Sequence, residues 1–245
     1  MTTQGVRIAV VSDIHGNLPA LQAVLADISR RGVDMVVNLG DSLSGPLLPL
    51  ETAQFLMQQD WVQLAGNHER QILEIGPNSD ASDRYAHDQL TLRELTWIAS
   101  LKPAHQFMPD VLLCHGTPTS DHTALLQTAE RAATGEEVKL RLGDTQAALV
   151  VCGHSHVPRA VRSTNGQLVV NPGSVGQPAY ADDYPYPHVV ENGCPDARYA
   201  IIEKQGERWI PGLFAVSYDY REMAALARSH GRHDWERALT TGYLS

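Results

Sequence analysis

The sequence predicts an α/β (α+β) fold in which two packed mixed β-sheets are flanked by helices. Short apolar runs alternate with helical patterns in the N-terminal part of the chain, which is typical of a parallel sheet. From about residue 158 the pattern becomes rich in strands, so a second sheet is expected. No internal repeat or low-complexity linker divides the 245 residues, a length that suits one large domain or two small ones. We expect one domain over 1–245.

The first strand is expected at residues 7–13, where an apolar run ends in a carboxylate. A helix is predicted over 18–31, because its apolar residues recur at helical spacing. Asn17 is a plausible N-cap for this helix, Pro19 is acceptable in its first turn, and Gly32 ends it.

A strand at 34–41, a helix at 48–59 and a strand at 61–68 continue the alternation. This β-α-β-α-β order predicts parallel strands joined by right-handed crossovers. Residues 79–101 look like a helical insertion, which Pro103 stops.

The second half of the chain carries mostly strand patterns. Asn165-Gly166 stands between two β-like runs, and this dipeptide is a strong signal for a hairpin turn. Further strands are expected at 110–116, 147–156, 198–203 and 208–218, a helical or mixed connection at 121–143, and helix again at 219–241.

The composition argues against several classes of partner. The formal charge is −9 and the longest run of basic residues is Arg30-Arg31, so neither long nucleic acid nor an anionic membrane is expected. Cys114 and Cys152 lie inside apolar runs and read as reduced core residues. The first residues show no signal-peptide pattern and no apolar stretch approaches the ~20 residues of a membrane span, so we expect a cytoplasmic protein.

Polar side chains follow five apolar runs, and in open α/β sheets the carboxyl ends of the strands form the site. Residues i and i+2 of an extended segment point the same way, so Asp13 with His15, and His154 with His156, are expected to converge. The full set is Asp13, His15, Asp41, Asn67, His68, His115, His154 and His156.

Carboxylate, imidazole and amide ligands without thiolate suit Mn²⁺, Fe or Zn²⁺, with Mn²⁺ or Fe favoured, better than a structural zinc. With His68 set aside, seven groups are too many for one tetrahedral ion. They suit two ions that share a bridging carboxylate at a separation of roughly 3.5–4 Å.

The motifs SDIHGN, LGD, GNHE, CHG and GHSHVP together resemble those of the calcineurin-like metallophosphoesterase superfamily. HGTP (115–118) and NPGSVGQP (171–178) resemble its small bacterial and archaeal branch. The resemblance implies a four-layer sandwich with a dinuclear metal centre. It further implies that His68 stays off the metals and faces the substrate phosphate, and that Asp41 bridges the ions. The first ion would be held by Asp13, His15 and His156, and the second by Asn67, His115 and His154.

These roles predict a metal-dependent phosphoesterase that uses a metal-activated hydroxide, with His68 as general acid. The expected substrate is a small phosphorylated molecule such as a nucleotide. The bond hydrolysed would be a phosphodiester or a phosphomonoester bond. Protein phosphatases and dinucleoside tetraphosphatases of the superfamily carry an arginine soon after Gly-Asp. Here none occurs between Asp41 and Glu69, which counts against both alternatives. A non-enzymatic binding module with the same fold is a further alternative for the function. The chain could also form a homodimer.

Residues 176–202 are rich in Tyr, Pro and Asp at their front and show no apolar period, so a long loop is expected, with 176–197 as a candidate lid. Its tyrosines Tyr180, Tyr184 and Tyr186 are candidates for stacking on a base or an aromatic leaving group; packing of this surface loop on its own domain or on a twin subunit is the alternative. Asn17 is a candidate phosphate ligand as well as a cap. His122 is the remaining histidine to check for a substrate contact.

Overall fold

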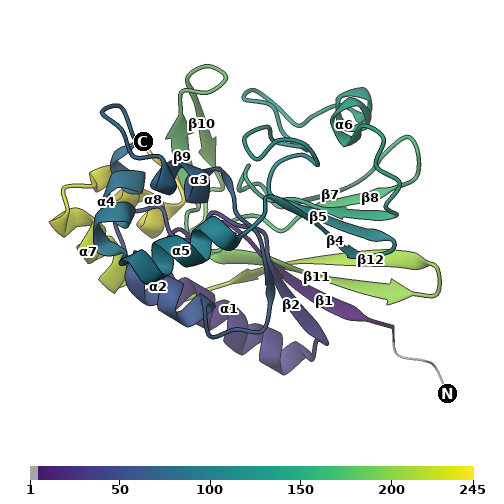
Figure 1. Ribbon diagram of the computed structural model, residues 1–245, viewed down its shortest axis with the longest axis horizontal. Coiled ribbons are helices and arrows are strands. Elements are labelled where there is room, and N and C mark those ends of the chain that lie inside the picture. The colour runs from purple at the N-terminus through teal and green to yellow at the C-terminus, as the bar shows by residue number, and fades with distance from the viewer. Residues whose placement is uncertain (1–4) are drawn as a thin grey trace.

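The first sheet joins strands from both ends of the chain. The structure is a computed structural model that describes residues 5–245. The expectation about a signal segment depends partly on residues 1–4, which lie outside the described range. The strands of this sheet are β1 (Arg7–Val11), β2 (Met35–Asn38), β3 (Val62–Gln63), β11 (Ala197–Gln205) and β12 (Arg208–Val216). Strand β1 lies at the centre, with β2 and β3 parallel to it on one side and β11 antiparallel on the other (Figure 1). The sheet is therefore mixed, as expected.

Helix α1 (Leu18–Arg31) has the predicted bounds. The Asn17 side chain accepts a hydrogen bond from the Ala20 amide at 3.3 Å, and Gly32 ends the helix with a φ of 65°. The buried stripe of the helix packs on the outer face of the first sheet, so the predicted amphipathic pattern is confirmed. Helix α2 (Pro49–Leu56) then returns the chain to β3.

The second sheet consists of β4 (Ala104–Met108), β5 (Val111–Cys114), β6 (Leu149–Val151), β7 (Arg159–Arg162) and β8 (Leu168–Asn171). Its order is β4-β5-β6-β8-β7, with the three middle strands parallel and the outer two antiparallel. The turn at Asn165-Gly166 joins β7 to β8, where Gly166 has a φ of 86°. The predicted hairpin is confirmed, whereas β4 was not predicted because its polar residues are exposed.

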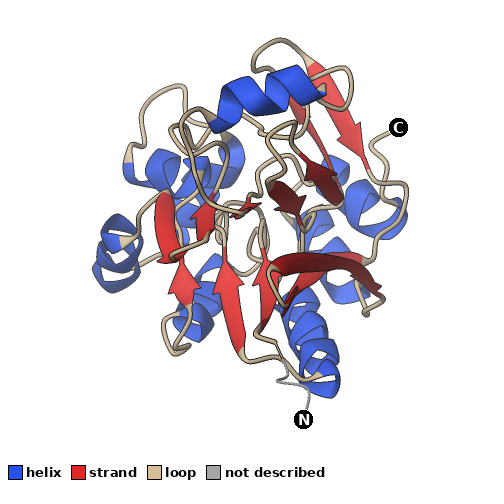
Figure 2. Ribbon diagram, turned by 90° about the vertical axis from the view of Figure 1, so that its right-hand side faces the viewer, coloured by secondary structure: helices blue, strands red, loops and turns tan. Residues whose placement is uncertain are grey.

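The two sheets pack face to face, and helices cover their outer faces, which gives four layers (Figures 1 and 2). Helix α6 (Gly135–Leu142) covers the second sheet, where Cys114 and Cys152 are buried as free thiols. Each fully buried aliphatic side chain between the sheets contributes about 1.5–3 kcal/mol. This central layer includes Ile8, Val10, Val37, Leu64, Val111, Leu113, Leu149, Val170 and Trp209.

Two segments differ from their predicted form. The strand expected at 61–68 ends early, and Asn67 begins helix α3 (Asn67–Leu73). Residues 79–101 form two helices, α4 (Ala81–Gln89) and α5 (Leu92–Ser100), because Thr91 caps the second one.

The stretch 176–202 is not the irregular loop that the sequence suggested. It contains β9 (Ala179–Asp182) and β10 (His188–Glu191), which form a separate antiparallel hairpin, before the chain enters β11. Each strand has only four residues, and Ala179 alone among these eight is buried, so the strands lack the apolar period that marks a core strand. The chain ends in α7 (Arg221–Ser229) and α8 (His233–Thr241), which pack on each other, and α8 also packs on β9 of this hairpin. None of the helices in residues 5–245 combines the length and apolarity needed to cross a bilayer.

Candidate metal centre

The turns after the strands hold the candidate ligands in an unusual backbone conformation. Among the described residues, the non-glycine residues with positive φ are Asp13 (55°), His15 (52°), Asp41 (52°), His154 (67°) and His156 (56°). Left-handed conformations cost non-glycine residues about 1–3 kcal/mol each and concentrate at functional sites. The extended i, i+2 geometry that we expected is therefore wrong, because left-handed turns aim these side chains. Asp13 and His15 do enter one cluster, whereas His154 and His156 enter different clusters.

The first cluster joins Asp13, His15 and His156, whose ligand atoms all lie within 4.8 Å of one another. The Nε2 atoms of the two histidines are 3.1 Å apart, and His156 Nε2 lies 3.4 Å from Asp13 Oδ1. His15 Nδ1 lies 2.8 Å from the carbonyl oxygen of Ser44, and His156 Nδ1 is 2.8 Å from that of Gln177. An Nδ1–H donated to a carbonyl leaves the Nε2 lone pair free, which is the usual arrangement of a ligating histidine.

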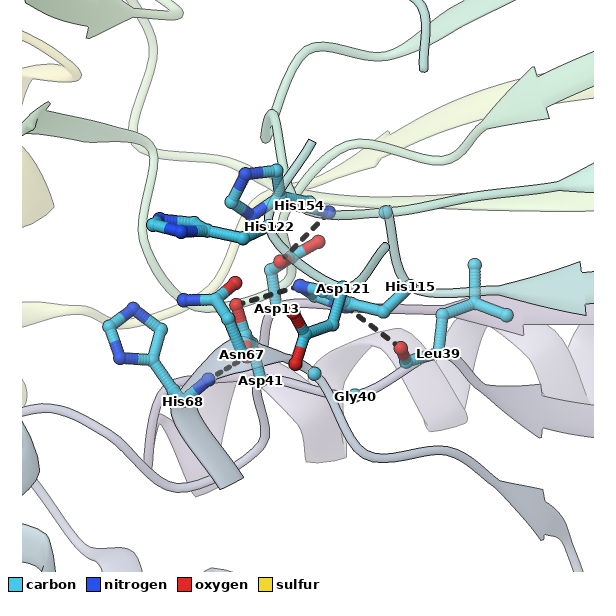
Figure 3. Close-up of polar contacts among 12 residues, drawn as sticks. Asp13, Leu39, Gly40, Asp41, Asn67, His68, His115, Asp121, His122 and His154 are labelled. Atoms are coloured by element: carbon cyan, nitrogen blue, oxygen red, sulfur yellow. Dashed lines mark hydrogen bonds and ion pairs between the residues drawn. The ribbon is translucent and has the colours of Figure 1, made fainter. Parts of the chain in front are cut away.

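The second cluster joins Asp41, His115 and His154, again within 4.8 Å. His115 Nε2 is 2.9 Å from Asp41 Oδ2, and its Nδ1 lies 2.9 Å from the Leu39 carbonyl oxygen. Asn67 projects its side chain beside Asp41 and His154 (Figure 3). The His154 amide donates to Asp13 Oδ1 at 3.2 Å, so the backbone ties the two clusters together.

Buried oxygens without a partner indicate that cations fit here. Asp13 Oδ2 and Asn67 Oδ1 are both buried, and neither has a hydrogen-bond partner within residues 5–245. A buried polar atom left unpaired costs about 1–3 kcal/mol. Both atoms are of the type that binds Mn²⁺ or Fe, and each belongs to the ligand set predicted from the sequence.

Most of the charge states of the site suit cation binding. The exception is His115, where burial lowers the pKa but Asp41 raises it by more, to about 9, so this ring must lose a proton to bind a cation. Burial raises the pKa of the Asp13 and Asp41 carboxyls. Neighbouring histidines, His156 for Asp13 and His115 for Asp41, lower it by more, so the pKa of each carboxyl lies below its ordinary value. Burial, together with other nearby histidines, lowers the pKa of His15 and of His154 to about 3. The two carboxylates are therefore ionised and these two imidazoles neutral, which are the forms that coordinate metal.

Glu69 holds the turn that carries Asp41. Its buried carboxylate accepts hydrogen bonds from the amides of Asp41 and Ser42, both at 2.8 Å, and of Gly66 at 2.7 Å. These bonds tie the turn after β2 to the start of α3. A Cβ at Gly66 would overlap Asp41 Oδ1, so the close approach of these two segments requires glycine.

His68 lies at the edge of both clusters and contacts neither through its ring nitrogens. Its amide donates to Asp41 Oδ1 at 2.9 Å, and its Nδ1 lies 2.7 Å from Asp83 Oδ1 on α4. Burial lowers the pKa of His68, but Asp41 and Asp83 raise it by more, to about 10. Asp83 was missed in the sequence because it lies inside a helix, away from every strand end.

A cavity of about 250 Å³ opens over both clusters. His122 and Tyr180 line it, with His122 packed edge-to-face on His154 at a centroid distance of 5.6 Å. Arg232, at the start of α8, is the sole lysine or arginine that lines it among the residues described. The stretch after Asp41 lacks an arginine, and Arg232 from the far end of the chain places a guanidinium in the cavity instead. No local sequence motif could indicate this.

Three of the predicted substrate contacts do not line this cavity. Tyr184 and Tyr186 line a neighbouring cavity instead of this one. Asn17, the candidate phosphate ligand that was also a candidate cap, has a buried side chain whose polar atoms are already engaged. Its Nδ2 donates to the Gly176 carbonyl at 3.0 Å and to the Tyr218 hydroxyl at 2.9 Å, while its oxygen caps α1.

This fold and this ligand set define a class of protein, and comparison with known families agrees. Residues 6–190 match the calcineurin-like phosphoesterase superfamily domain. The chain belongs to this superfamily, whose members are phosphoester hydrolases that use divalent metal ions.

Relatives of similar length occur in archaea and bacteria. An uncharacterised protein of Methanocaldococcus jannaschii is 29% identical over 241 residues, covering 88% of this chain and 89% of its own. The crystal structure of a metallophosphoesterase from Sphaerobacter thermophilus superposes with a TM-score of 0.76 at 24% identity, covering 98% of this chain and 100% of that one. A hypothetical protein of Pyrococcus horikoshii gives a TM-score of 0.75 at 17% identity, with coverage of 98% and 100%. The two solved structures share the fold, so the predicted four-layer sandwich is confirmed.

Proposed function

We propose that this protein hydrolyses phosphodiester or phosphomonoester bonds with two divalent cations held by the two clusters. The observation that carries the proposal is the pair of adjoining ligand clusters at the floor of one cavity. Asp13, His15 and His156 would hold one ion, with Asn67, His115 and His154 around the other. Asp41, which belongs to the second cluster and accepts a hydrogen bond from the His68 amide, would bridge the ions.

Two bound cations supply Lewis acidity and lower the pKa of a water toward 7, which makes hydroxide available at neutral pH. The chain's own contribution begins with position. His68 stands on the first turn of α3, so the same turn that presents Asn67 also fixes the His68 ring. Asp83 accepts the Nδ1 proton of His68, which leaves Nε2 to face the cavity.

His68 would therefore act as the general acid of the hydrolysis. A proton held at Nε2 would pass to the leaving oxygen, a role typically worth ~10²–10⁴ in rate. Arg232 lines the same cavity, where three of its five N–H donors are engaged by Asp234 and by the Ser82 hydroxyl. Its two remaining N–H groups would bind a phosphate oxygen that the cations do not reach.

The size of the cavity favours a small phosphorylated substrate, such as a nucleotide. Mn²⁺ or Fe suits the oxygen-and-imidazole donor set best. The net charge of −9 supports our inference that long nucleic acid is not a partner.

Hydrolysis of bis-(p-nitrophenyl) phosphate and p-nitrophenyl phosphate in Mn²⁺ tests the proposal. Asp41→Asn is expected to abolish hydrolysis and to reduce bound metal. Asp144→Asn is the matched control, because Asp144 also follows a glycine but lies exposed after α6. A metal-loaded wild-type protein that hydrolyses no phosphoester would indicate the alternative, a binding module that keeps the fold.

A further inference from the structure

A second cavity, of about 310 Å³, adjoins the metal cavity. The two share four lining residues, His122, His154, Tyr180 and Asp182, so a molecule bound over the metal clusters can extend into the second cavity. We call this space the aromatic cavity, because rings supply much of its wall. Its other lining residues include Tyr184, Tyr186, His188 and Val190. Its volume falls at the low end of the roughly 300–1,000 Å³ typical of small-molecule sites.

One wall of the aromatic cavity is a single face of the β9–β10 hairpin. Tyr180 pairs directly with Val190 across the two strands, and Asp182 pairs with His188. Alternate residues of a strand project on the same side, so these two pairs share one face. All four residues line the cavity. The hairpin is thus built to present a ring-bearing surface toward the metal clusters.

A stacked pair of rings continues this surface outward. The rings of His122 and Tyr184 stack with centroids 4.4 Å apart and planes inclined by 19°. His122 in turn packs on His154, a candidate metal ligand, at 5.6 Å. Tyr184 is nevertheless 52% exposed, and Tyr186 is 44% exposed. Exposed tyrosines beside a cavity form a platform on which a flat group can stack.

The charged groups of the aromatic cavity do not suit an anion. Arg141 lines the cavity, but its Nη1 donates to the carbonyls of Ala124 and Gln127, both at 2.9 Å, which holds one side of the guanidinium against that segment. The Asp182 carboxylate accepts from the Tyr184 amide at 2.9 Å and adds a negative charge. A phosphate would therefore stay at the metal clusters, and an uncharged flat ring would occupy the aromatic cavity.

We infer that the aromatic cavity binds an aromatic group of the substrate, a nucleobase or a simple aryl ring, while its phosphate lies at the metal clusters. The inference rests on the proposed function, because it places the phosphate of the substrate. It deepens that function by assigning the class of the group attached to the phosphate.

Binding of matched ligand pairs to the Mn²⁺-loaded protein tests the inference by calorimetry, with each ligand used as its phosphonate analogue, in which a carbon replaces the ester oxygen, so that no ligand is hydrolysed. Adenosine 5′-monophosphate and ribose 5-phosphate differ in the base, whereas phenyl phosphate and ethyl phosphate differ in a simple ring. We expect the aromatic member of at least one pair to bind about fivefold or more tightly, as base stacking on protein rings allows. A preference in the first pair alone identifies a nucleobase site, and a preference in both identifies a general aryl site.

The variant Tyr184→Ala should erase that preference, and Tyr184→Phe should keep it. Tyr184 is exposed on a hairpin turn, so the substitution leaves the core intact. Tyr220→Ala is the control, because Tyr220 lines neither cavity. Equal affinities within both pairs, or a preference that Tyr184→Ala leaves unchanged, would overturn the inference. Hydrolysis of bis-(p-nitrophenyl) phosphate, measured on the same preparation, reports separately on the proposed function, since a protein without hydrolysis could still show the preference.

Discussion

Replacement of Glu69 should show how strongly one buried carboxylate organises the metal centre. The change Glu69→Ala leaves three buried amides, those of Asp41, Ser42 and Gly66, without their acceptor. Each orphaned donor costs about 1–2 kcal/mol, so the expected loss is about 3–6 kcal/mol. That is a large part of the roughly 5–15 kcal/mol that holds a typical domain folded.

Glu69→Gln should cost less. One carboxylate oxygen accepts from both Asp41 and Gly66, and the other accepts from Ser42. The amide oxygen of glutamine can keep the first pair, while its NH₂ group then opposes the Ser42 amide, for a loss of about 2 kcal/mol. Urea denaturation measures both losses, and Glu207→Gln, in the exposed turn between β11 and β12, is the surface control.

Thermal unfolding gives a second readout of the same variants. At roughly 2–4 °C per kcal/mol for a domain of this size, Glu69→Ala should melt about 6–24 °C below the wild type. It should also bind less metal, because Asp41 loses its support. Stability within about 0.5 kcal/mol of the wild type, the range of an ordinary surface change, would refute the role assigned to Glu69.

Three further outcomes are expected. His68→Gln should lower kcat by ~10²–10⁴ with both ions retained, and metal analysis that finds an ion lost would contradict a role in proton transfer alone. Arg232→Ala should raise KM for small phosphoesters more than it lowers kcat, measured against Arg237→Ala, which lines neither cavity; an unchanged KM would remove Arg232 from substrate binding. Hydrogen bonds from the Tyr199 hydroxyl and, to a smaller extent, from Arg31 lower the pKa of Asp27 below its ordinary value near 3.8. Ionised Asp27 therefore stabilises the fold at pH values above about 3.8. The stability gap between wild type and Asp27→Asn should therefore shrink as the pH falls from about 5 to 3, and a gap that stays constant in urea melts would argue against this.

The sequence was informative about the ligands because each one follows an apolar run. Asp41 and His115 come directly after strands or one short turn beyond them, and the sheets bring those ends together. The way in which the ligands converge was not predictable from alternation alone. Asp13 and His15 adopt left-handed conformations, which a strand pattern does not reveal.

Residues that act through tertiary contact left no local signal. Asp83 on α4 contacts His68 on α3, and Arg232 lines the cavity from the start of α8. Both depend on how helices dock, whereas the pattern of apolar residues reports only which face of a helix is buried.

The β9–β10 hairpin was misread for a related reason. Its strands have four residues each, with only Ala179 among them buried, and the turn between them is rich in proline and tyrosine. Pairing between the two strands, with Tyr180 opposite Val190, gives them their structure without a place in the main core.

Anomalous scattering from crystals grown with Mn²⁺ is the most direct test of the central claim. We predict two manganese peaks at the floor of the cavity, roughly 3.5–4 Å apart as in other two-metal sites. One peak should lie among Asp13, His15 and His156, and the other among Asn67, His115 and His154. A single peak, or manganese bound only away from these residues, would contradict the assignment.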